Sequence, residues 1–309
     1  MAENPAADDS VRIEPIKPHI GARVHVDKAR LCDPGVVEAI RQAMEDRGVL
    51  VFPQLHLTDE EQLAFTDAFG PRLNYTNGRG LREMGLENGS GSSAKAEDDD
   101  VYRIRLGQES RFGEEVVLAT WFWHMDGATV DQPLPKATML SARHLAPKGG
   151  QTEFASTFAA WDALSEAQKD EIADLEVVHR VAAAMRFVLP DLAGERAERM
   201  RMGNSMVLPM VWTQADGRKS LVLGTHADRV LGMPYAAGQS LIARLMEWSG
   251  QPDFTYSHDW QLGDFVIWNN CGVMHRVVPY AADSGRDMHR TSIRGDIKLG
   301  YALPRSAAA

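Results

Sequence analysis

Three His-x-Asp motifs occur in the sequence, and each places an imidazole and a carboxylate two residues apart. Residues two apart on a β-strand point to the same face, so each motif could offer two ligands to one metal ion. The pattern arises easily by chance, and its context has to decide which copy does chemistry. The motifs are His25-Val26-Asp27, His124-Met125-Asp126 and His226-Ala227-Asp228.

The surrounding sequence favours His124-Met125-Asp126. The aromatic run 121–123 precedes it and Gly127 follows, which predicts a strand that leaves an aromatic-lined interior, as a shielded metal pocket requires. The motif at 25–27 lies before the first predicted helix and is expected to be a polar strand edge. The motif at 226–228 comes directly after a strand and is expected on a turn that faces solvent or the core.

His275 is the candidate for a third ligand from another strand. It follows a turn and a strongly apolar strand at residues 263–268. Two histidines and one carboxylate on one face of an octahedron form the facial triad of non-haem Fe(II) oxygenases, which leaves three positions for substrate and O₂. The sequence therefore predicts an iron site at His124, Asp126 and His275. A zinc hydrolase that uses the same three residues is the alternative.

Two arginines follow the distal histidine. Arg286 and Arg290 lie four apart in a segment that is typical of a strand, so both are expected to face the same way. A guanidinium binds a carboxylate bidentately, and buried arginines without anionic partners are costly. Two arginines that point into one pocket would imply two anions there. The alternative is a pair of exposed arginines on a strand edge.

Composition limits the class of protein. The chain has 309 residues, of which 44% are hydrophobic and 25% charged, as in soluble globular proteins. A formal net charge of −10 argues against a nucleic-acid partner but leaves room for a basic pocket that binds a small anion. No apolar run is long enough to cross a membrane, and the N-terminus lacks the pattern of a signal peptide. The only two cysteines, Cys32 and Cys271, predict no disulfide framework and a cytoplasmic location.

Helix caps and apolar runs predict a mainly β fold with flanking helices. Asp33 before Pro34 and the capping box that starts at Thr58 each predict a helix, and Ser165 with Gln168 predicts another. Together these elements favour a β-sandwich or jelly roll with helices packed outside. A fourth helix is expected at 239–248, and strands are expected at 49–52, 116–121, 137–142, 220–223 and 264–268.

The predicted organisation is one domain over residues 13–300, between a disordered segment 1–12 and a tail 301–309. Residues 72–115 lack periodicity, and Gly, Ser, Asn and acidic residues dominate from Asn77 to Asp100. A segment this long without periodicity is either functional, for example a mobile lid, or a tolerated insertion. The sequence leaves the oligomeric state open, a homo-oligomer included.

Four ordered motifs resemble the TauD/TfdA family, the taurine and 2,4-dichlorophenoxyacetate dioxygenases, from about residue 45 to about residue 296. The C-terminal half is more similar to the 2,4-dichlorophenoxyacetate branch, in the stretches 224–227, 232–234 and 251–256 and in Trp260 with Gly263-Asp264. The four motifs are Trp123-His124-Met125-Asp126, Pro147-Lys148-Gly149-Gly150-Gln151-Thr152, Trp268-Asn269-Asn270 with Met274-His275-Arg276, and Arg286-Asp287-Met288-His289-Arg290.

The resemblance implies a double-stranded β-helix of the cupin-like jelly-roll type. It implies Fe(2+) at His124, Asp126 and His275, with 2-oxoglutarate and O₂ as co-substrates. Thr152 and Arg286 match the residues that hold the distal carboxylate of 2-oxoglutarate, and Arg290 matches the position that meets the sulfonate or carboxylate of a small anionic substrate. The implied reaction is hydroxylation with release of succinate and CO₂, followed by C–O or C–S cleavage where the hydroxylated carbon bears such an atom.

The chain departs from the family pattern at two places. The family commonly has Trp-Asp-Asn-Arg before the distal histidine, whereas this chain has Trp268-Asn269-Asn270-Cys271, so the hydrogen bonds around the ligands must differ. The segment 74–113 aligns with neither member, which leaves the substrate open. Desaturation or amino-acid hydroxylation with the same cofactors, and a non-catalytic metal-binding jelly-roll protein, are the alternatives. A zinc hydrolase would leave Arg286 and Thr152 without a role.

Overall fold

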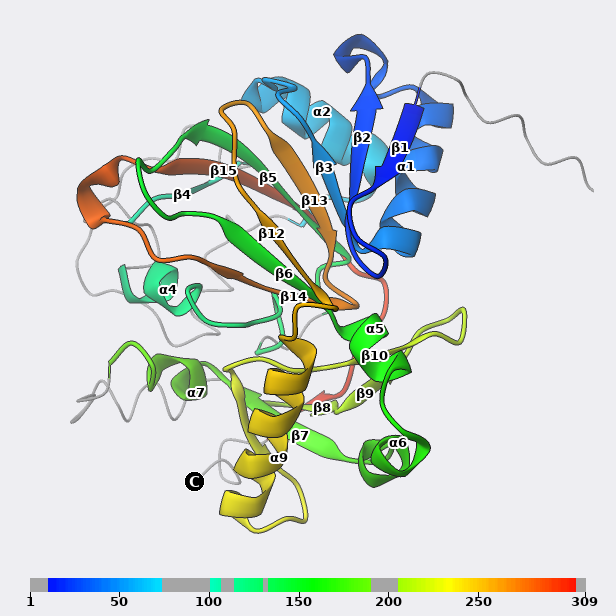
Figure 1. Cartoon of the computed structure of the whole chain (residues 1–309), viewed down its shortest axis with the longest axis vertical. Helices are drawn as coiled ribbons and strands as arrows, with labels where there is room; N and C mark the ends of the chain where they lie inside the picture. The colour runs from blue at the N-terminus through cyan, green and yellow to red at the C-terminus, as the bar shows by residue number, and fades with distance from the viewer. Residues whose placement is uncertain (1–10, 74–100, 107–113, 130–132, 190–204, 304–309) are drawn as a thin grey trace, which may run out of the picture.

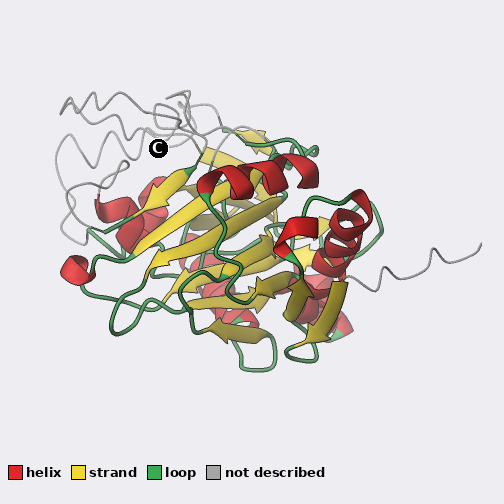
Figure 2. Cartoon of the chain, turned by 90° about the horizontal axis from the view of Figure 1, so that it is seen from above, coloured by secondary structure: helices red, strands yellow, loops and turns green. Residues whose placement is uncertain are grey.

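The structure is a computed structural model that describes residues 11–73, 101–106, 114–129, 133–189 and 205–303 (Figure 1). Strands outnumber helices in this part of the chain, and Figure 2 shows the strands side by side with helices outside them. The prediction of a mainly β fold with flanking helices is confirmed at this level. The helices are α1 (Pro34–Arg47), α2 (Asp59–Phe69), α4 (Glu114–Ala119), α5 (Thr157–Asp162), α6 (Glu166–Ile172), α7 (Val181–Met185) and α9 (Tyr235–Ser249), with short 3₁₀ turns at Lys28–Arg30 and Ala282–Ser284.

The largest sheet has seven strands in the order β1-β2-β3-β13-β5-β15-β4. All its neighbours are antiparallel except β2 and β3, which run parallel. The smaller sheets have the orders β12-β6-β14, β11-β7-β8-β16 and β10-β9. The strands of the large sheet are β1 (Val11–Pro15), β2 (Ala22–Val26), β3 (Val49–Phe52), β4 (Tyr102–Ile104), β5 (Ala137–His144), β13 (Phe265–Asn269) and β15 (Asp287–Ile293). The others are β6 (Thr152–Ser156), β7 (Glu176–Arg180), β8 (Ser205–Pro209), β9 (Val211–Thr213), β10 (Lys219–Leu221), β11 (Ala227–Val230), β12 (Thr255–His258), β14 (Val273–Val277) and β16 (Tyr301–Ala302).

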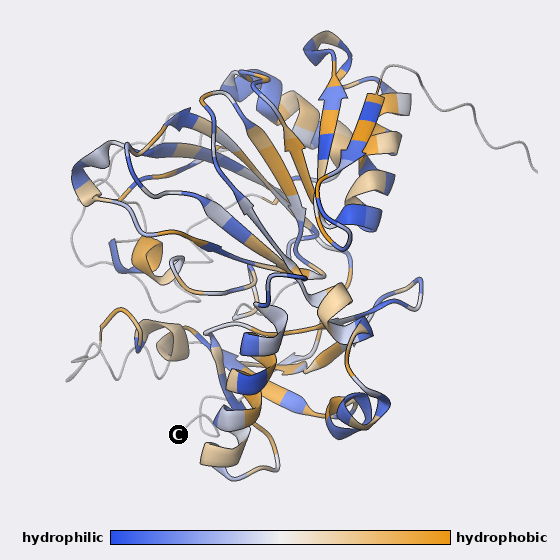
Figure 3. Cartoon of the chain, in the orientation of Figure 1, coloured by the Kyte–Doolittle hydropathy of each residue, from blue (hydrophilic) through white to orange (hydrophobic). Residues whose placement is uncertain are grey.

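Strand β13 lies in the middle of the large sheet and is buried on both faces, which explains the apolar sequence of its first four residues (Figure 3). Phe265 and Ile267 pack toward α1 and α2 on one face. Val266 and Trp268 pack on the other face, against Phe154 of β6 and residues of β14. The three-stranded sheet therefore faces the large sheet across a shared core, and β14 carries His275 into the space between them.

The predicted helix caps are largely confirmed. Thr58 and Ser165 form the reciprocal capping boxes expected at the starts of α2 and α6. Helix α1 begins at Pro34 as predicted, but the side chain of Asp33 makes no capping hydrogen bond. Helix α9 begins at Tyr235, earlier than predicted, and includes Gly238, where an added Cβ would lie 3.2 Å from the backbone nitrogen of Val230. The helix therefore packs closely on β11.

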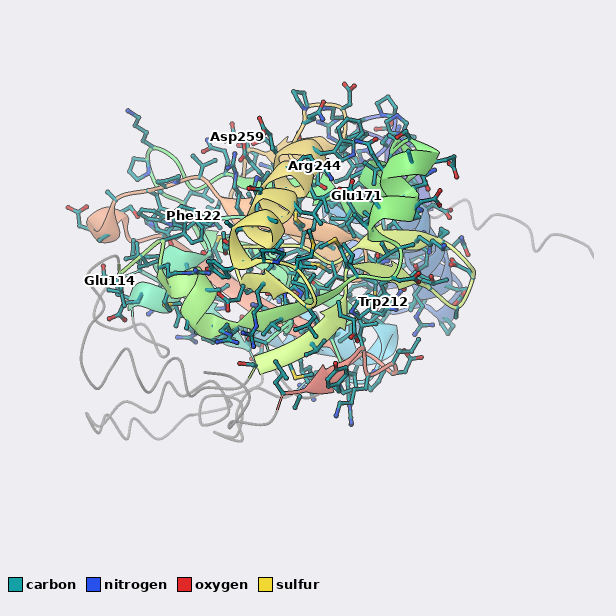
Figure 4. All side chains as sticks on the ribbon, turned by 90° about the horizontal axis from the view of Figure 1, so that it is seen from below. Glu114, Phe122, Glu171, Trp212, Arg244 and Asp259 are labelled. Atoms are coloured by element: carbon teal, nitrogen blue, oxygen red, sulfur yellow. The ribbon has the colours of Figure 1, made fainter. Side chains whose placement is uncertain are left out.

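The lower part of the molecule in Figure 1 holds α5, α6, α9 and the sheet β11-β7-β8-β16. Its apolar core includes Trp212, Leu241 and Met125, the residue between two of the candidate ligands. Seen from below, α9 crosses this part of the molecule, and its Arg244 forms an ion pair with Glu171 of α6 at 2.5 Å (Figure 4). This lower core supports the segment that carries His124 and Asp126.

The prediction of a strand at 116–121 is wrong, because Glu114–Ala119 forms helix α4. The β-branched pair Val116-Val117 favoured a strand, but β-propensity depends strongly on tertiary context. Glu114 and Glu115 occupy the first turn, where the helix dipole favours negative charge. Backbone bonds of the 3₁₀ type continue the turn to Trp121 and Phe122. The strand expected at 220–223 is shorter than predicted and ends at Leu221.

The described residues also bear on the predicted bounds of the N-terminal segment, the tail and segment 72–115. Strand β1 begins at Val11, so residues 11 and 12 are ordered in a sheet, and the rest of the predicted disordered segment lies outside the described residues. Tyr301–Ala302 pairs with β8, so the predicted tail begins with a strand. Most of segment 72–115 lies outside the described residues, but Tyr102–Ile104 forms edge strand β4. Cys32 and Cys271 are both free, and no helix among the described residues is long and apolar enough to cross a membrane.

Candidate active site

The three predicted metal ligands come together. One potential ligand atom from each of His124, Asp126 and His275 lies within 4.8 Å of the others. The backbones of His124 and His275 exchange two hydrogen bonds of 3.0 Å each, as an isolated antiparallel bridge. The two imidazole centroids lie 4.2 Å apart. Among the described residues, this is the one group of three or more His, Cys, Asp or Glu side chains close enough to hold an ion.

The local geometry differs from the strand that the sequence predicted for His124 and Asp126. His124 belongs to a single bridge, and Asp126 lies in a turn. The two side chains therefore do not converge through the alternation of a regular strand. They converge because the bridge to β14 fixes His124 beside His275, while other contacts hold the peptide that follows.

Asp126 is a buried, charged carboxylate with one oxygen left for a cation. Its Oδ2 accepts hydrogen bonds from Thr138 Oγ1 at 2.7 Å and from Arg290 Nη2 at 2.8 Å. Its Oδ1 lies 3.9 Å from Nε2 of His275. Burial alone would raise the pKa of this carboxyl, but Arg290, the two histidines and Thr138 hold the pKa well below its usual range. The carboxylate is thus ionised and oriented as a ligand.

The two imidazoles are suited to bind a metal ion as neutral ligands. Nδ1 of His124 lies 2.9 Å from the carbonyl of Phe122, so Nδ1–H donates there and Nε2 keeps its lone pair. Burial lowers the pKa of His124, and burial together with the neighbouring His124 lowers the pKa of His275 well below its usual value. The indole of Trp268 packs 4.7 Å from the ring of His275. Neutral nitrogen donors and a carboxylate fit a divalent transition metal.

A hydrogen-bond chain behind Asp126 was not foreseen from the sequence. Asn270 Nδ2 donates to Thr138 Oγ1 at 2.9 Å, and that hydroxyl in turn donates to Asp126. Asn269, where the family commonly has aspartate, accepts from the backbone of Cys271 at 3.0 Å and donates to Glu45 at 3.1 Å. Asn270, which keeps the asparagine of the family pattern, therefore supports the ligand Asp126 through Thr138, whereas the departing residue Asn269 contacts Cys271 and Glu45. No spacing or motif marks Thr138, which has the sequence context of an ordinary strand residue.

Arg286 is the second notable charge. It is 4% exposed, its Nη2 donates to the carbonyl of Gly150 at 3.1 Å, and its guanidinium lies 4.9 Å from the centroid of the Tyr280 ring. Within the described part of the chain, no carboxylate pairs with it. Thr152, 1% exposed, lies two residues after Gly150, and its hydroxyl accepts from Trp260 Nε1 at 3.0 Å. Its own O–H is left to donate, so both groups can bind an anion.

The two arginines are not placed as the strand pattern predicted. Arg286 precedes β15, whose register shifts between Asp287 and Met288, so simple alternation does not relate it to Arg290. Arg290 lies within β15 and already has one anion, Asp126. The sequence predicted two external anions for the two arginines, whereas Arg290 has an anionic partner within the protein. One N–H donor of Arg290 orients the candidate ligand Asp126.

Gly150 makes room for Arg286. For the 2-oxoglutarate that the family resemblance implies at Arg286, we expect Gly150→Ala to raise the KM by about tenfold, roughly 1.4 kcal/mol. An added Cβ would lie 3.0 Å from Arg286 Nε, and the backbone has a φ of +81°. Steady-state kinetics with varied 2-oxoglutarate measure the effect. Gly217→Ala is the control, because Gly217 has a φ of +85° with open space around it. Equal effects of the two substitutions would contradict this role of Gly150.

The other two His-x-Asp motifs are not metal sites in the described structure. His25 lies on strand β2, as predicted, but β2 is not an edge strand, because it pairs with both β1 and β3; His25 Nε2 lies 3.0 Å from Glu14 on β1. His226 is buried and contacts His179 and the backbone of Met125. Asp228 pairs with Arg180 and with a second arginine, Arg186. The two residues of the motif thus have separate contacts: His226 with histidine and backbone, and Asp228 with arginines.

A partly buried histidine, a buried histidine and a buried carboxylate in a mainly β fold form a candidate site for one metal ion of the non-haem type. The sequence profile described as "Taurine catabolism dioxygenase TauD, TfdA family" matches residues 12–292. The chain belongs to this family of dioxygenases. The predicted resemblance is confirmed, as is the class of 2-oxoglutarate-dependent dioxygenase.

Individual relatives agree with this assignment. The "Alpha-ketoglutarate-dependent 2,4-dichlorophenoxyacetate dioxygenase" of Cupriavidus pinatubonensis is 35% identical over 93% of this chain and 99% of its own length. The "(S)-phenoxypropionate/alpha-ketoglutarate-dioxygenase" of Sphingobium herbicidovorans is 30% identical over 94% of this chain and 97% of its own. A solved structure, "Crystal structure of AAD-2 in complex with Mn(II) and N-oxalylglycine", matches with a TM-score of 0.76 and 30% identity, covering 94% of this chain and 100% of that chain.

Proposed function

We propose that the protein binds Fe(II) through His124, Asp126 and His275 and oxidises a small organic anion with 2-oxoglutarate and O₂. The observation that carries the proposal is the buried, charged Asp126 with one oxygen facing the two neutral histidines. When bound, iron with 2-oxoglutarate and O₂ supplies the oxidant that removes hydrogen from a substrate C–H bond. The residues of this chain bind, orient and shield the reactants.

Arg286 and Thr152 are proposed to hold the distal carboxylate of 2-oxoglutarate. Support comes from the buried guanidinium, which has no carboxylate partner in the described part of the chain, and from the hydroxyl that Trp260 leaves free to donate. A buried guanidinium is costly without an anion, so a carboxylate ligand would stabilise it. N-oxalylglycine, which is bound with Mn(II) in the AAD-2 structure, carries two carboxylates and a carbonyl spaced as in 2-oxoglutarate.

The substrate is proposed to be an organic acid with an apolar, preferably aromatic, part. The Arg290 guanidinium carries five N–H donors; it contacts Asp126 and Ser292, and its positive charge can also attract an anionic group of the substrate. Tyr102 of edge strand β4 lies directly opposite Arg290, and Ile104 lies opposite Met288, so the tyrosine ring is on the same face as the guanidinium. The names of the relatives above refer to aryloxy acids, which combine these two features.

The proposed reaction is hydroxylation, followed by C–O or C–S cleavage where the hydroxylated carbon bears such an atom. The alternatives are desaturation or amino-acid hydroxylation with the same cofactors. Mass spectrometry of the product separates hydroxylation, which adds one oxygen, from desaturation, which removes two hydrogens, and comparison of amino acids with other acids as substrates tests amino-acid hydroxylation. We also propose that the two facing sheets form the double-stranded β-helix of the family within one domain. A cytoplasmic location and a homo-oligomer remain predictions.

A screen for substrate-triggered succinate release tests the function. Aryloxyalkanoates, alkyl and aryl sulfonates and simple carboxylic acids are each added to the enzyme with Fe(II), 2-oxoglutarate and O₂. We expect the largest stimulation from aryl-bearing acids, with one succinate for each product molecule. Neutral analogues, such as the matching esters, should stimulate weakly. A neutral compound that outperforms its acid would contradict the role of Arg290.

In this proposal Arg290 binds the substrate anion and also orients the ligand Asp126, and two variants separate these roles. We expect Arg290→Ala to raise the KM for an acidic substrate about a hundredfold and to weaken metal binding up to about tenfold, given the usual cost of removing a charged partner. Thr138→Val removes the other hydrogen bond to Asp126 Oδ2 and should weaken metal binding alone. Substrate KM and Fe(II) affinity are measured for both variants. The proposed role of Arg290 in substrate binding is contradicted if Arg290→Ala and Thr138→Val raise the KM for the substrate equally.

A further inference from the structure

The peptide between two of the ligands is held by a side chain from a distant part of the chain. The backbone N–H of Met125 donates to Nε2 of His226 at 3.1 Å. One residue earlier, the backbone N–H of Thr225 donates to the carbonyl of Trp123 at 2.9 Å. Segment 225–226 therefore contacts both sides of His124. Because 123–126 is not a regular strand, such contacts must fix its course.

The hydrogen bond to Met125 sets the proton positions of two buried histidines. Nε2 of His226 accepts, so the proton of this imidazole is on Nδ1. That Nδ1 lies 2.7 Å from Nδ1 of His179, which must accept and carry its own proton on Nε2. His179 is fully buried on β7, and its Nε2 has no hydrogen-bond partner in the described structure. The result is a directed chain from His226 to His179 that presents a lone pair to the Met125 N–H.

The surroundings leave His226 no free nitrogen for another role. Both ring nitrogens are engaged, and the side chain is not among the three potential ligands at the metal centre. Gly224 lies against the same place, because an added Cβ there would come within 2.5 Å of His226 Nε2 and 3.1 Å of His124 Cα. The ring is thus packed tightly behind the peptide that joins His124 to Asp126.

We propose that His226, oriented by His179, is a positioning residue that fixes the Met125 peptide and thereby the relative placement of the ligands His124 and Asp126. Without the acceptor, a buried N–H would be left unpaired and the peptide could rotate. The two ligand side chains, one on each side of that peptide, would then lose their fixed separation. This role accounts for the third His-x-Asp motif, whose aspartate pairs instead with arginines.

Metal titration of variants tests the proposal. His226→Phe keeps the ring volume but removes the acceptor, and we expect Fe(II) or Co(II) affinity to fall about ten- to a hundredfold, as for other residues that orient ligands. His226→Gln can place Oε1 near the position of Nε2, and we expect its affinity to return to within about threefold of wild type. His179→Phe removes only the partner of His226 and should give a smaller loss in the same direction.

Ile172→Ala is the control that separates an effect on stability from an effect on ligand positioning. It creates a cavity in the same core, at the end of α6. This variant should lower Tm while leaving metal affinity unchanged. The proposal is overturned if His226→Phe lowers Tm as much but binds metal like wild type, or if His226→Gln restores nothing. The inference rests on the metal site of the proposed function. Wild-type protein that binds no metal would contradict that function, whereas unaffected variants contradict only the positioning role.

The tautomers can be read in the wild-type protein, so this test does not depend on the metal affinity of a variant. Long-range ¹H–¹⁵N NMR of histidine-labelled apoprotein should show His226 protonated at Nδ1 with a bare Nε2, and His179 protonated at Nε2. The assignment of the two rings follows from their loss in His226→Gln and His179→Phe. A proton on Nε2 of His226 would overturn the proposal, because that nitrogen could not accept from Met125.

Discussion

Asp126→Asn should reduce Fe(II) affinity by at least about a thousandfold, roughly 4 kcal/mol, and abolish coupled turnover. The amide keeps the shape and can still accept from Thr138 and Arg290, but it removes the negative charge that faces the two histidines. Anaerobic titration with Fe(II) or Co(II) measures the affinity, and circular dichroism confirms the fold.

Asp228→Asn is the matched control for this substitution. It alters the carboxylate of another His-x-Asp motif, which pairs with Arg180 at 3.2 Å and with Arg186 at 2.9 Å. A small loss of stability is expected, with metal affinity unchanged. The assignment of Asp126 as a ligand is wrong if both variants bind metal as tightly as wild type.

The second large effect is expected at Arg286. Arg286→Ala should raise the KM for 2-oxoglutarate about a hundredfold, roughly 2.7 kcal/mol, because a buried charge-assisted pair is lost. Arg286→Lys keeps a charge without the planar fork and should recover only part of the loss. Fe(II) affinity without 2-oxoglutarate should stay near the wild-type value, because the guanidinium contacts Gly150 and Tyr280.

Arg143→Ala controls for the loss of a guanidinium elsewhere in the fold. Arg143 on β5 pairs with Asp59 of α2 at 2.8 Å, outside the candidate site. Its removal should leave the KM for 2-oxoglutarate unchanged. An Arg286→Ala enzyme with unchanged KM would show that the distal carboxylate binds elsewhere.

Local sequence signals predicted the elements whose stability is local. The capping boxes at Thr58 and Ser165 fix their helix starts through hydrogen bonds within a few residues, and both occur as predicted. Strand β13 was predictable because a strand buried on both faces is rich in apolar residues, as 265–268 are. Helix α4 was missed because its Val116-Val117 pair favours strands, and the packing that decides its conformation is not visible in a short window.

The candidate site divides in the same way. The sequence predicted His124, Asp126, His275, Arg286 and Arg290 as site residues because their types and spacing suit metal and carboxylate binding. Thr138, Asn270, His179 and His226 were missed or set aside, since each acts through a contact with a residue far away in the sequence. His226 Nε2, for example, meets a backbone N–H that belongs to Met125, 101 positions earlier.

The function of Arg290 illustrates what three-dimensional placement adds. Its spacing from Arg286 suggested a second external anion, whereas one of its donors lies 2.8 Å from Asp126. A substrate anion at this arginine would therefore share a guanidinium with a metal ligand. Substrate binding and the electrostatics of the metal site are expected to be coupled at this residue.

The most direct test of the central claim is anaerobic spectroscopy of the wild-type protein. Addition of Fe(II) and then 2-oxoglutarate to the apoprotein should produce the visible charge-transfer band of the iron–2-oxoglutarate chelate. The band should saturate at one equivalent of each and be absent in His124→Ala. Folded wild-type protein that shows no band with both additions would contradict the assignment of His124, Asp126 and His275 as an iron site that binds 2-oxoglutarate.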